Sequence, residues 1–285
     1  MQSETIIGAG GIRLSYDRLG SAGNQPLILL HGGGQTRGSW GTLANLLAER
    51  GYDVFSLDLR GHGDSEWASD KDYSLSSYRD DLRALLATID RPPVLVGASL
   101  GGVTALLTLG EGTGDEAVAL VLVDITPWID ETETSKIADF MRNRPEGFED
   151  MDDAVRAVSA YLPHRTSPQR LGGLTRNLRR DPNGRLKWHW DPQIMAPDNA
   201  QEAAARTDRM VAAAHAIRVP TLLVRGEHSR IVRPEHVAEL CSIIPGLKVV
   251  EVAGAGHMVA GDDNDAFDNA VTEFLKEVPA ADPHR

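Results

Sequence analysis

The sequence predicts an α/β fold in which a mostly parallel central sheet is flanked by helices on both faces. Short apolar strands alternate with longer helical segments along most of the 285 residues. The strands are apolar at successive positions, as expected for parallel strands that are buried on both faces. With a hydrophobic content of 41% the chain can bury one large core, and α/β folds of this length are commonly single domains.

The first elements are two short strands around a turn at Gly10 and Gly11, which is a hairpin signal. This turn is not a dinucleotide-binding motif, because the third glycine of that motif is missing and no helix follows. The alternation of strands and helices begins after the hairpin. Strands are expected at 26–31, 53–58, 93–97 and 119–124, and helices at 39–50, 76–89 and 99–109.

The alternation stops after 119–124, and the segment 127–218 contains helical patterns and one hairpin but no parallel-strand signal. In the hairpin Leu186, Trp188 and Trp190 alternate with polar residues and therefore share a face. We expect this segment to be a mainly helical cap inserted between two parts of the core, 1–126 and 219–285. The second part continues with strands at 219–226 and 247–254 and helices at 234–243 and 265–277.

Composition disfavours several classes of partner. The net charge of -12 argues against nucleic-acid and anionic-membrane binding, which need clustered Lys and Arg. A single cysteine, Cys241, excludes an internal disulfide, and its apolar helical surroundings predict a buried thiol. His31 has no neighbours at metal-ligand spacing, so we expect no metal and no cofactor. Without a leader-like or membrane-spanning segment, we expect a cytoplasmic monomer or homodimer that acts on a small molecule.

The strongest functional signal is VLVGASLGG at 94–102, which places Ser99 directly after a strand and at the start of a helix. Gly97 and Gly101 lie two residues on either side, and this G-x-S-x-G spacing is typical of a tight turn that exposes a nucleophilic serine. Only small neighbours allow the strand and the helix to approach so closely. We therefore predict that Ser99 is a nucleophile.

The glycine-rich stretch LLHGGGQ at 29–35 follows another core strand and predicts an oxyanion-binding loop. A backbone N–H of this loop, together with that of Leu100, would provide two donors for a developing oxyanion. We favour Gly33 as the donor in the loop. The same loop contributes two candidates for substrate contact, Gly32 and Gly34.

A candidate general base follows the last core strand. In VAGAGHMV at 252–259, His257 lies in a loop between flanking glycines, late in the chain and downstream of the nucleophile. A histidine combined with a nucleophilic serine predicts general-base catalysis. The adjacent Met258 is a further candidate for substrate contact.

Four motifs together, HGGG, DLRGHGDS, GASLGG and GAGHMV, resemble the α/β-hydrolase fold family over nearly the whole chain. Within it the chain is similar to cap-bearing esterases, lactonases, cofactor-free haloperoxidases and epoxide hydrolases. The resemblance implies that Asp58, Arg60 and His62 hold their loop together. It also implies acyl transfer, because epoxide hydrolases and haloalkane dehalogenases have a carboxylate nucleophile where this chain has Ser99.

The acid that would orient the histidine departs from the family's usual pattern, which would place it at Ser229. A minority of the family carries the acid at the end of the strand that follows the nucleophile's helix, and Asp124 occupies that position. An aspartate there also has a structural alternative, the capping of the following turn. The other candidates are Glu227, Asp262 or Asp263, and a Ser–His dyad without an acid.

The implied activity is hydrolysis of a carboxylic ester or lactone through a Ser–His–Asp triad and an acyl-enzyme. A perhydrolase or haloperoxidase-like activity of the same residues, and a non-catalytic small-molecule receptor, are the alternatives. Apolar residues of the cap either line the substrate pocket or form the cap's own small core. These residues are Trp128, Met141, Phe148, Trp188 and Trp190.

Overall fold

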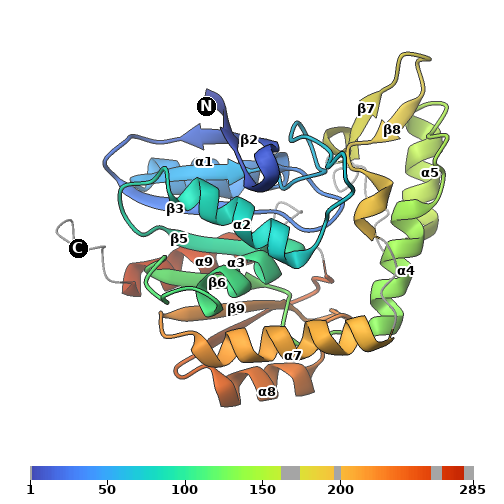
Figure 1. Ribbon diagram of the computed structural model, residues 1–285. Coiled ribbons are helices and arrows are strands. Elements are labelled where there is room, and N and C mark those ends of the chain that lie inside the picture. The colour runs from blue at the N-terminus through green and yellow to red at the C-terminus, as the bar shows by residue number, and fades with distance from the viewer. Residues whose placement is uncertain (1, 162–173, 196–199, 258–264, 279–285) are drawn as a thin grey trace.

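The computed structural model describes residues 2–161, 174–195, 200–257 and 265–278 and confirms the predicted α/β fold. An eight-stranded sheet has the order β1-β2-β4-β3-β5-β6-β9-β10 (Figure 1). β1 and β2 form the predicted antiparallel hairpin, β2 is antiparallel to β4, and the remaining neighbours are parallel. The strands are β1 (Gln2–Ile7), β2 (Arg13–Leu19), β3 (Gln25–Leu30), β4 (Tyr52–Leu57), β5 (Val94–Ala98), β6 (Ala119–Val123), β9 (Thr221–Gly226) and β10 (Lys248–Val252).

Helices cover both faces of this sheet, and alternate side chains of each central strand belong to different core clusters. In β3, Leu27 and Leu29 face the helices α1 and α9, whereas Ile28 and Leu30 belong to the cluster that contains α2, α3, α7 and α8. All four leucine and isoleucine side chains are fully buried. These helices are α1 (Gly41–Glu49), α2 (Leu75–Leu86), α3 (Leu100–Gly110), α7 (Ala200–Ala216), α8 (Pro234–Ile243) and α9 (Asp265–Glu277).

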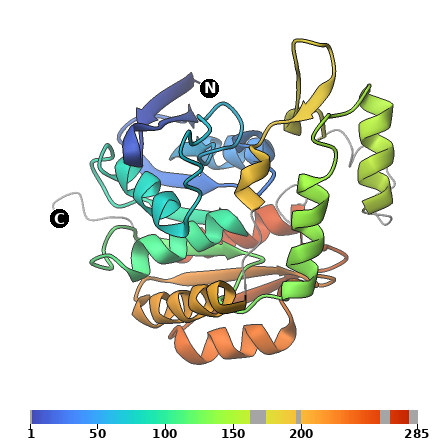
Figure 2. The same cartoon turned by 45° about the vertical axis from the view of Figure 1, so that its right-hand side comes forward.

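The remaining elements lie together beside the sheet (Figures 1 and 2). They have a hydrophobic cluster of their own, which includes Phe148, Ala154, Leu174 and Leu186. The elements beside the sheet are α4 (Glu131–Arg142), α5 (Met151–Tyr161), β7 (Leu178–Arg180), β8 (Leu186–Trp188) and the 3-10 helices Leu174–Asn177 and Pro192–Met195. Two further 3-10 helices lie in the first part of the core, Ala9–Gly11 between β1 and β2 and Arg37–Trp40 before α1.

Two expectations differ from the structure. Helix α7 lies inside the predicted cap range 127–218, but it packs on α3, and its Met210, Ala213 and Ala214 are buried in the core of the sheet. The apolar face of α7 therefore packs against the core of the sheet and not against the other helices of the predicted cap. Cys241, expected to be buried, is exposed on α8, because the helix turns Leu240 into the core instead.

Among the described residues, no helix is both long and apolar enough to cross a membrane.

A buried ion pair joins the N-terminal hairpin to the core. The guanidinium of Arg60 donates two hydrogen bonds to Asp81 on α2, at 2.6 and 2.7 Å, and both side chains are almost completely buried. The Ala9 amide donates to the same carboxylate (2.9 Å), and the Ala9 carbonyl accepts from Arg60 (3.1 Å). Asp81 thus connects the hairpin turn, α2 and the loop after β4.

We expect Asp81→Ala to lower the free energy of unfolding by about 3–5 kcal/mol, because it leaves the buried Arg60 guanidinium without its carboxylate. Asp80→Ala on the same helix is the matched control, since its 41% exposed carboxylate makes only surface ion pairs and should cost less than about 1 kcal/mol. Urea unfolding of both variants provides the comparison. Equal losses would show that the Arg60–Asp81 pair contributes no more to stability than the surface ion pairs of Asp80.

Candidate active site

Ser99 lies in a strained turn between β5 and α3. Its backbone has φ 46° and ψ -113°, a left-handed conformation that is unusual for a residue with a side chain. The Ser99 amide donates to the Val123 carbonyl at the end of the neighbouring strand (3.1 Å). The structure therefore has the sharp strand-to-helix turn that the G-x-S-x-G spacing predicts.

Close backbone packing around this turn explains its glycines. A Cβ on Gly97 would lie 2.4 Å from the Gly101 carbonyl oxygen, and one on Gly101 would lie 2.2 Å from the Leu30 carbonyl oxygen. Both distances are too short for any side chain, and the obstacle in each case is backbone. The small residues thus allow α3 to start directly against β3 and β5, which holds Ser99 in place.

Asp124 occupies the equivalent position after β6. The pairing of Ala98 with Val123 makes β5 and β6 immediate neighbours, so Ser99 and Asp124 follow adjacent strand ends. Asp124 also has a positive φ of 49° and is fully buried. Its Oδ2 lies 2.6 Å from Nδ1 of His257, whose side chain is 20% exposed.

Two further donors hold the Asp124 carboxylate, and both come from β9 and the loop after it. The Gly226 amide donates to Oδ1 (3.0 Å), and the Ser229 hydroxyl donates to Oδ2 (2.5 Å). Ser229 in turn accepts a hydrogen bond from the Val232 amide (3.2 Å). Sequence reasoning missed this contact of Ser229, although the serine stands where most of the family carries its acid.

Glu227, the other candidate acid among the described residues, forms no hydrogen bond with His257. The Glu227 carboxylate is 46% exposed and accepts from the Gly254 amide (2.7 Å). Asp262, Asp263 and the predicted substrate contact Met258 lie outside the described residues. Within the described part of the chain, no hydrogen bond joins Ser99 to His257.

The amides of the glycine-rich loop are almost all occupied. The Gly32 amide donates to Oε1 of Gln35 (2.9 Å), the Gln35 amide to the Gly32 carbonyl (3.1 Å), and the Gly34 amide to Nε2 of His62 (3.1 Å). The amides of Gly33 and Leu100 have no acceptor among the described residues. These two donors are the ones that the sequence predicts for an oxyanion hole.

The three glycines of this loop differ in their surroundings. A Cβ on Gly32 would lie 3.4 Å from the Ser99 Cβ, so Gly32 is next to Ser99. Gly34 has φ 73°, and a Cβ there would lie 2.9 Å from Cε of Met141 and 3.5 Å from Cζ3 of Trp190. Side chains from α4 and from the segment after β8 therefore lie close to the loop at Gly34.

The predicted aromatic residues differ in their surroundings. Trp188 packs edge-on against Phe148 and stacks on Trp190 at 4.4 Å between ring centroids. Trp128 is partly buried and packs against the main core. Of the three tryptophans, Trp190 has the most direct contact with the candidate site.

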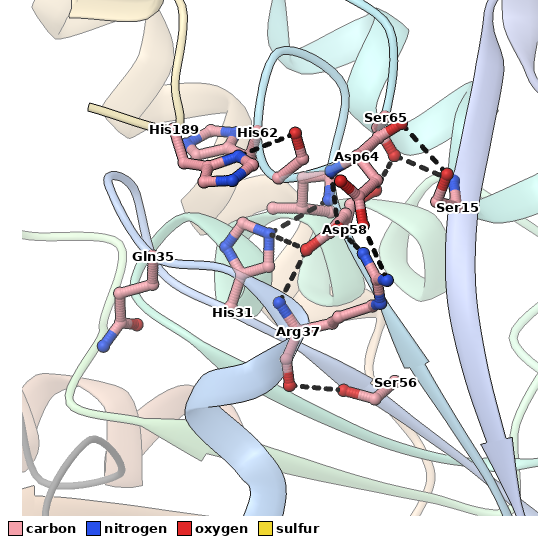
Figure 3. A network of polar contacts seen from close by, with 12 residues as sticks. Ser15, His31, Gln35, Arg37, Ser56, Asp58, His62, Asp64, Ser65 and His189 are labelled. Atoms are coloured by element: carbon pink, nitrogen blue, oxygen red, sulfur yellow. Dashed lines mark hydrogen bonds and ion pairs between the residues drawn. The ribbon is translucent and has the colours of Figure 1, made fainter. Parts of the chain in front are cut away.

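Two buried histidines lie beneath the glycine-rich loop (Figure 3). The Leu59 amide donates to Nε2 of His31 (3.0 Å), so the proton is on Nδ1, which donates to the Gly32 carbonyl (2.8 Å). Burial lowers the pKa of His31 to about 4 and that of His62 to about 3. Both imidazoles are therefore neutral, and His31 organises the loop as the sequence predicts.

A buried ion pair lies beside His31 (Figure 3). The Asp58 carboxylate pairs with the Arg37 guanidinium and accepts from the amides of Arg37 (2.7 Å) and Asp64 (2.9 Å). Burial raises the pKa of Asp58, and the arginine opposes this shift. Arg37, which also pairs with Asp17 at 3.1 Å, had no signal in the sequence because its partners come from distant segments.

No group of three or more metal-binding side chains is assembled within the described residues.

Because His31 and His62 are neutral in the folded protein, we expect the protein to lose stability in acid. An unfolded histidine has a pKa of about 6.5, whereas the folded values of His31 and His62 are about 4 and about 3. The unfolded chain therefore binds more protons, so this stability is present above about pH 6.5 and is lost as the pH falls toward the folded values.

Between about pH 7.5 and pH 5, the free energy of unfolding should fall by about 2 kcal/mol for each of the two histidines. Urea unfolding at both pH values measures the loss. His62→Gln removes one titrating group, so its loss should be smaller than that of the wild type by about 2 kcal/mol. An identical loss in the two proteins would mean that His62 does not resist protonation in the folded state.

Comparison with known proteins identifies the fold family. Residues 25–263 match the family described as alpha/beta hydrolase fold. An esterase of Mycobacterium tuberculosis is 32% identical over 259 residues, which cover 87% of this chain and 82% of that protein. An sn-1-specific diacylglycerol lipase of Mus musculus is 30% identical over 280 residues, covering 92% of this chain and 85% of that protein.

A solved structure extends the similarity to three dimensions. The structure of E-2-(acetamidomethylene)succinate hydrolase has a TM-score of 0.77 and 27% identity, and the match covers 96% of this chain and 99% of that chain. These relatives are named as hydrolases and esterases, and the family match extends over most of the core strands. The chain belongs to the α/β-hydrolase fold family.

Proposed function

We propose that this protein is a serine hydrolase that cleaves a carboxylic ester through an acyl-enzyme. The observation that carries the proposal is the 2.6 Å contact between His257 and the buried Asp124. It lies at the edge of the sheet where Ser99 occupies a strained turn on the adjacent strand. Ser99, Asp124 and His257 thus follow three strands of one sheet, an arrangement that is compatible with a Ser–His–Asp triad.

The contact to Asp124 determines which nitrogen of His257 acts as the base. Nδ1–H donates to the carboxylate, which leaves Nε2 free to accept a proton from the Ser99 hydroxyl. The serine oxygen attacks the ester carbonyl carbon, and its proton goes to Nε2. Asp124 stabilises the resulting imidazolium and fixes the orientation of the ring.

The free amides of Gly33 and Leu100 stabilise the charge that develops on the carbonyl oxygen. Collapse of the tetrahedral intermediate breaks the carbon–oxygen bond to the leaving alcohol, which takes the proton from His257. Water, deprotonated by the same nitrogen, then attacks the acyl-enzyme carbonyl and releases the carboxylic acid and Ser99. Two preorganised donors of this kind lower the barrier more than most single interactions.

The cap residues favour an apolar acyl group. Met141 and Trp190 approach Gly34 of the oxyanion loop and are themselves almost completely buried. Because the side chains that border the oxyanion loop at Gly34 are apolar, we propose a hydrophobic ester, with a lactone as the cyclic form of the same chemistry. The relative named esterase supports the open-chain ester as the first choice.

Exposure to a fluorophosphonate tests the nucleophile without knowledge of the substrate. The wild-type protein should gain the mass of one adduct, and Ser99→Ala should gain none, because the activated hydroxyl is absent. Intact-protein mass spectrometry measures both. A folded wild-type protein that remains unmodified would contradict the proposed activity and favour the receptor alternative.

Asp124→Asn tests the position of the acid. The neutral amide cannot stabilise the imidazolium, so kcat should fall by about 10⁴-fold with the fold retained. Glu227→Gln is the matched control, because Glu227 is exposed and directed toward the Gly254 amide, and it should retain nearly full activity. Hydrolysis of 4-nitrophenyl butyrate gives the rates, and a reversed result would assign the acid to Glu227.

A further inference from the structure

We infer that His62 is a positioning residue of the oxyanion hole, which it controls by holding the Gly34 amide. The inference rests on the proposed function, since it concerns the geometry of the same site. It goes further because it states which side chain makes Gly33 the donor of the loop.

The loop contains two successive peptide planes that meet at the Cα of Gly33, the first of which carries the Gly33 N–H. In a trans peptide the carbonyl and the following N–H point in opposite directions. The Gly32 carbonyl is held by His31 Nδ1–H (2.8 Å) and by the Gln35 amide (3.1 Å), which directs the Gly33 N–H away from the buried histidines. These contacts fix the first plane only.

The second plane, between Gly33 and Gly34, is held by His62 alone among the described residues. Its Nε2 accepts the Gly34 N–H at 3.1 Å, and its Nδ1–H donates to the Arg60 carbonyl at 3.0 Å. Glycine has little conformational preference of its own, so Gly33 and Gly34 depend on such contacts for a single conformation. Without the His62 acceptor this plane could rotate, and Gly33, whose Cα joins the two planes, would no longer hold its N–H in a single direction.

Neither ring nitrogen of His62 is available for proton transfer to a substrate. The side chain has no exposed surface, and both ring nitrogens already have backbone partners. Its ring also packs edge-on against His31 at 4.9 Å between centroids. His62 is thus excluded as a general base, and its effect on the reaction must pass through Gly34.

The cap holds the backbone of His62 from the other side. His62 forms an isolated antiparallel bridge with Trp190, the Gly63 amide donates to the His189 carbonyl (2.9 Å), and the Asp191 amide donates to the Gly61 carbonyl (2.8 Å). The segment after β8 is therefore paired with the loop that carries His62. This pairing leaves the imidazole little freedom to move away from Gly34.

Two substitutions separate the acceptor from the bulk of the side chain. His62→Leu removes the acceptor and leaves the Gly34 amide unpaired. His62→Gln places an amide oxygen near the position of Nε2 and retains the hydrogen bond. Tyr73→Phe is the control for general loosening, because it removes hydrogen bonds to Asp191 (2.7 Å) and from the Ala68 amide (2.9 Å) without touching Gly34.

The measurement is the rate at which the fluorophosphonate modifies Ser99, together with kcat and KM for 4-nitrophenyl butyrate and the thermal midpoint of each protein. His62→Leu should react about 100-fold more slowly, with the loss in kcat and not in KM, since one misplaced oxyanion donor costs about that much. His62→Gln should recover to within about tenfold of wild type, and Tyr73→Phe should remain within about threefold.

Three results would overturn the inference: a folded His62→Leu with wild-type rates, a His62→Gln as slow as the leucine variant, or a Tyr73→Phe equally slow. If His62→Leu does not fold, His62→Asn replaces it, because its shorter amide does not reach Gly34 and should be slow where the glutamine is not. Failure of the proposed function gives a different result, since the wild type itself would then remain unmodified.

Discussion

The buried carboxylate of Asp124 is the constraint on which the candidate site depends. Burying a carboxylate is unfavourable unless hydrogen-bond donors replace its hydration. Here the donors are the Gly226 amide, the Ser229 hydroxyl and Nδ1 of His257, which come from the ends of β9 and β10 and the loops that follow them. The need to satisfy one carboxylate therefore holds the turn after β9 and the loop after β10 at the end of β6, and it orients the histidine as a consequence.

The glycine-rich loop contrasts with Asp124, because the buried side chains that hold the loop are neutral. His31 and His62 are buried without a charge, and each imidazole uses one nitrogen as acceptor and the other as donor to the backbone. A protonated ring could not accept from Leu59 or Gly34, so burial that lowers both pKa values also preserves the hydrogen bonds. Backbone donors can thus be fixed near Ser99 without placing a competing positive charge beside them.

The sequence was sufficient for the features that depend on local pattern. The strand and helix alternation and the turn at Ser99 were readable, because each requires particular residue types at fixed spacing. Asp124, which follows β6, was a candidate only through the resemblance to the family. The contacts of Ser229 and Arg37 were not, since their partners are distant in sequence. Helix α7 was assigned to the cap because an apolar helical face has the same period whether it covers a cap or a sheet.

The candidate acid Asp124 shows that two positions of this fold can reach the same place beside the histidine. Ser229 Oγ lies 2.5 Å from the Asp124 oxygen that contacts His257, so positions 124 and 229 reach the same point from adjacent strands. Two carboxylates there would repel, which explains why only one position carries an acid. With the aspartate on β6, the hydroxyl at 229 becomes a donor to it. The left-handed backbone at 124 suits this choice, because Asp tolerates that conformation better than most residues with a side chain.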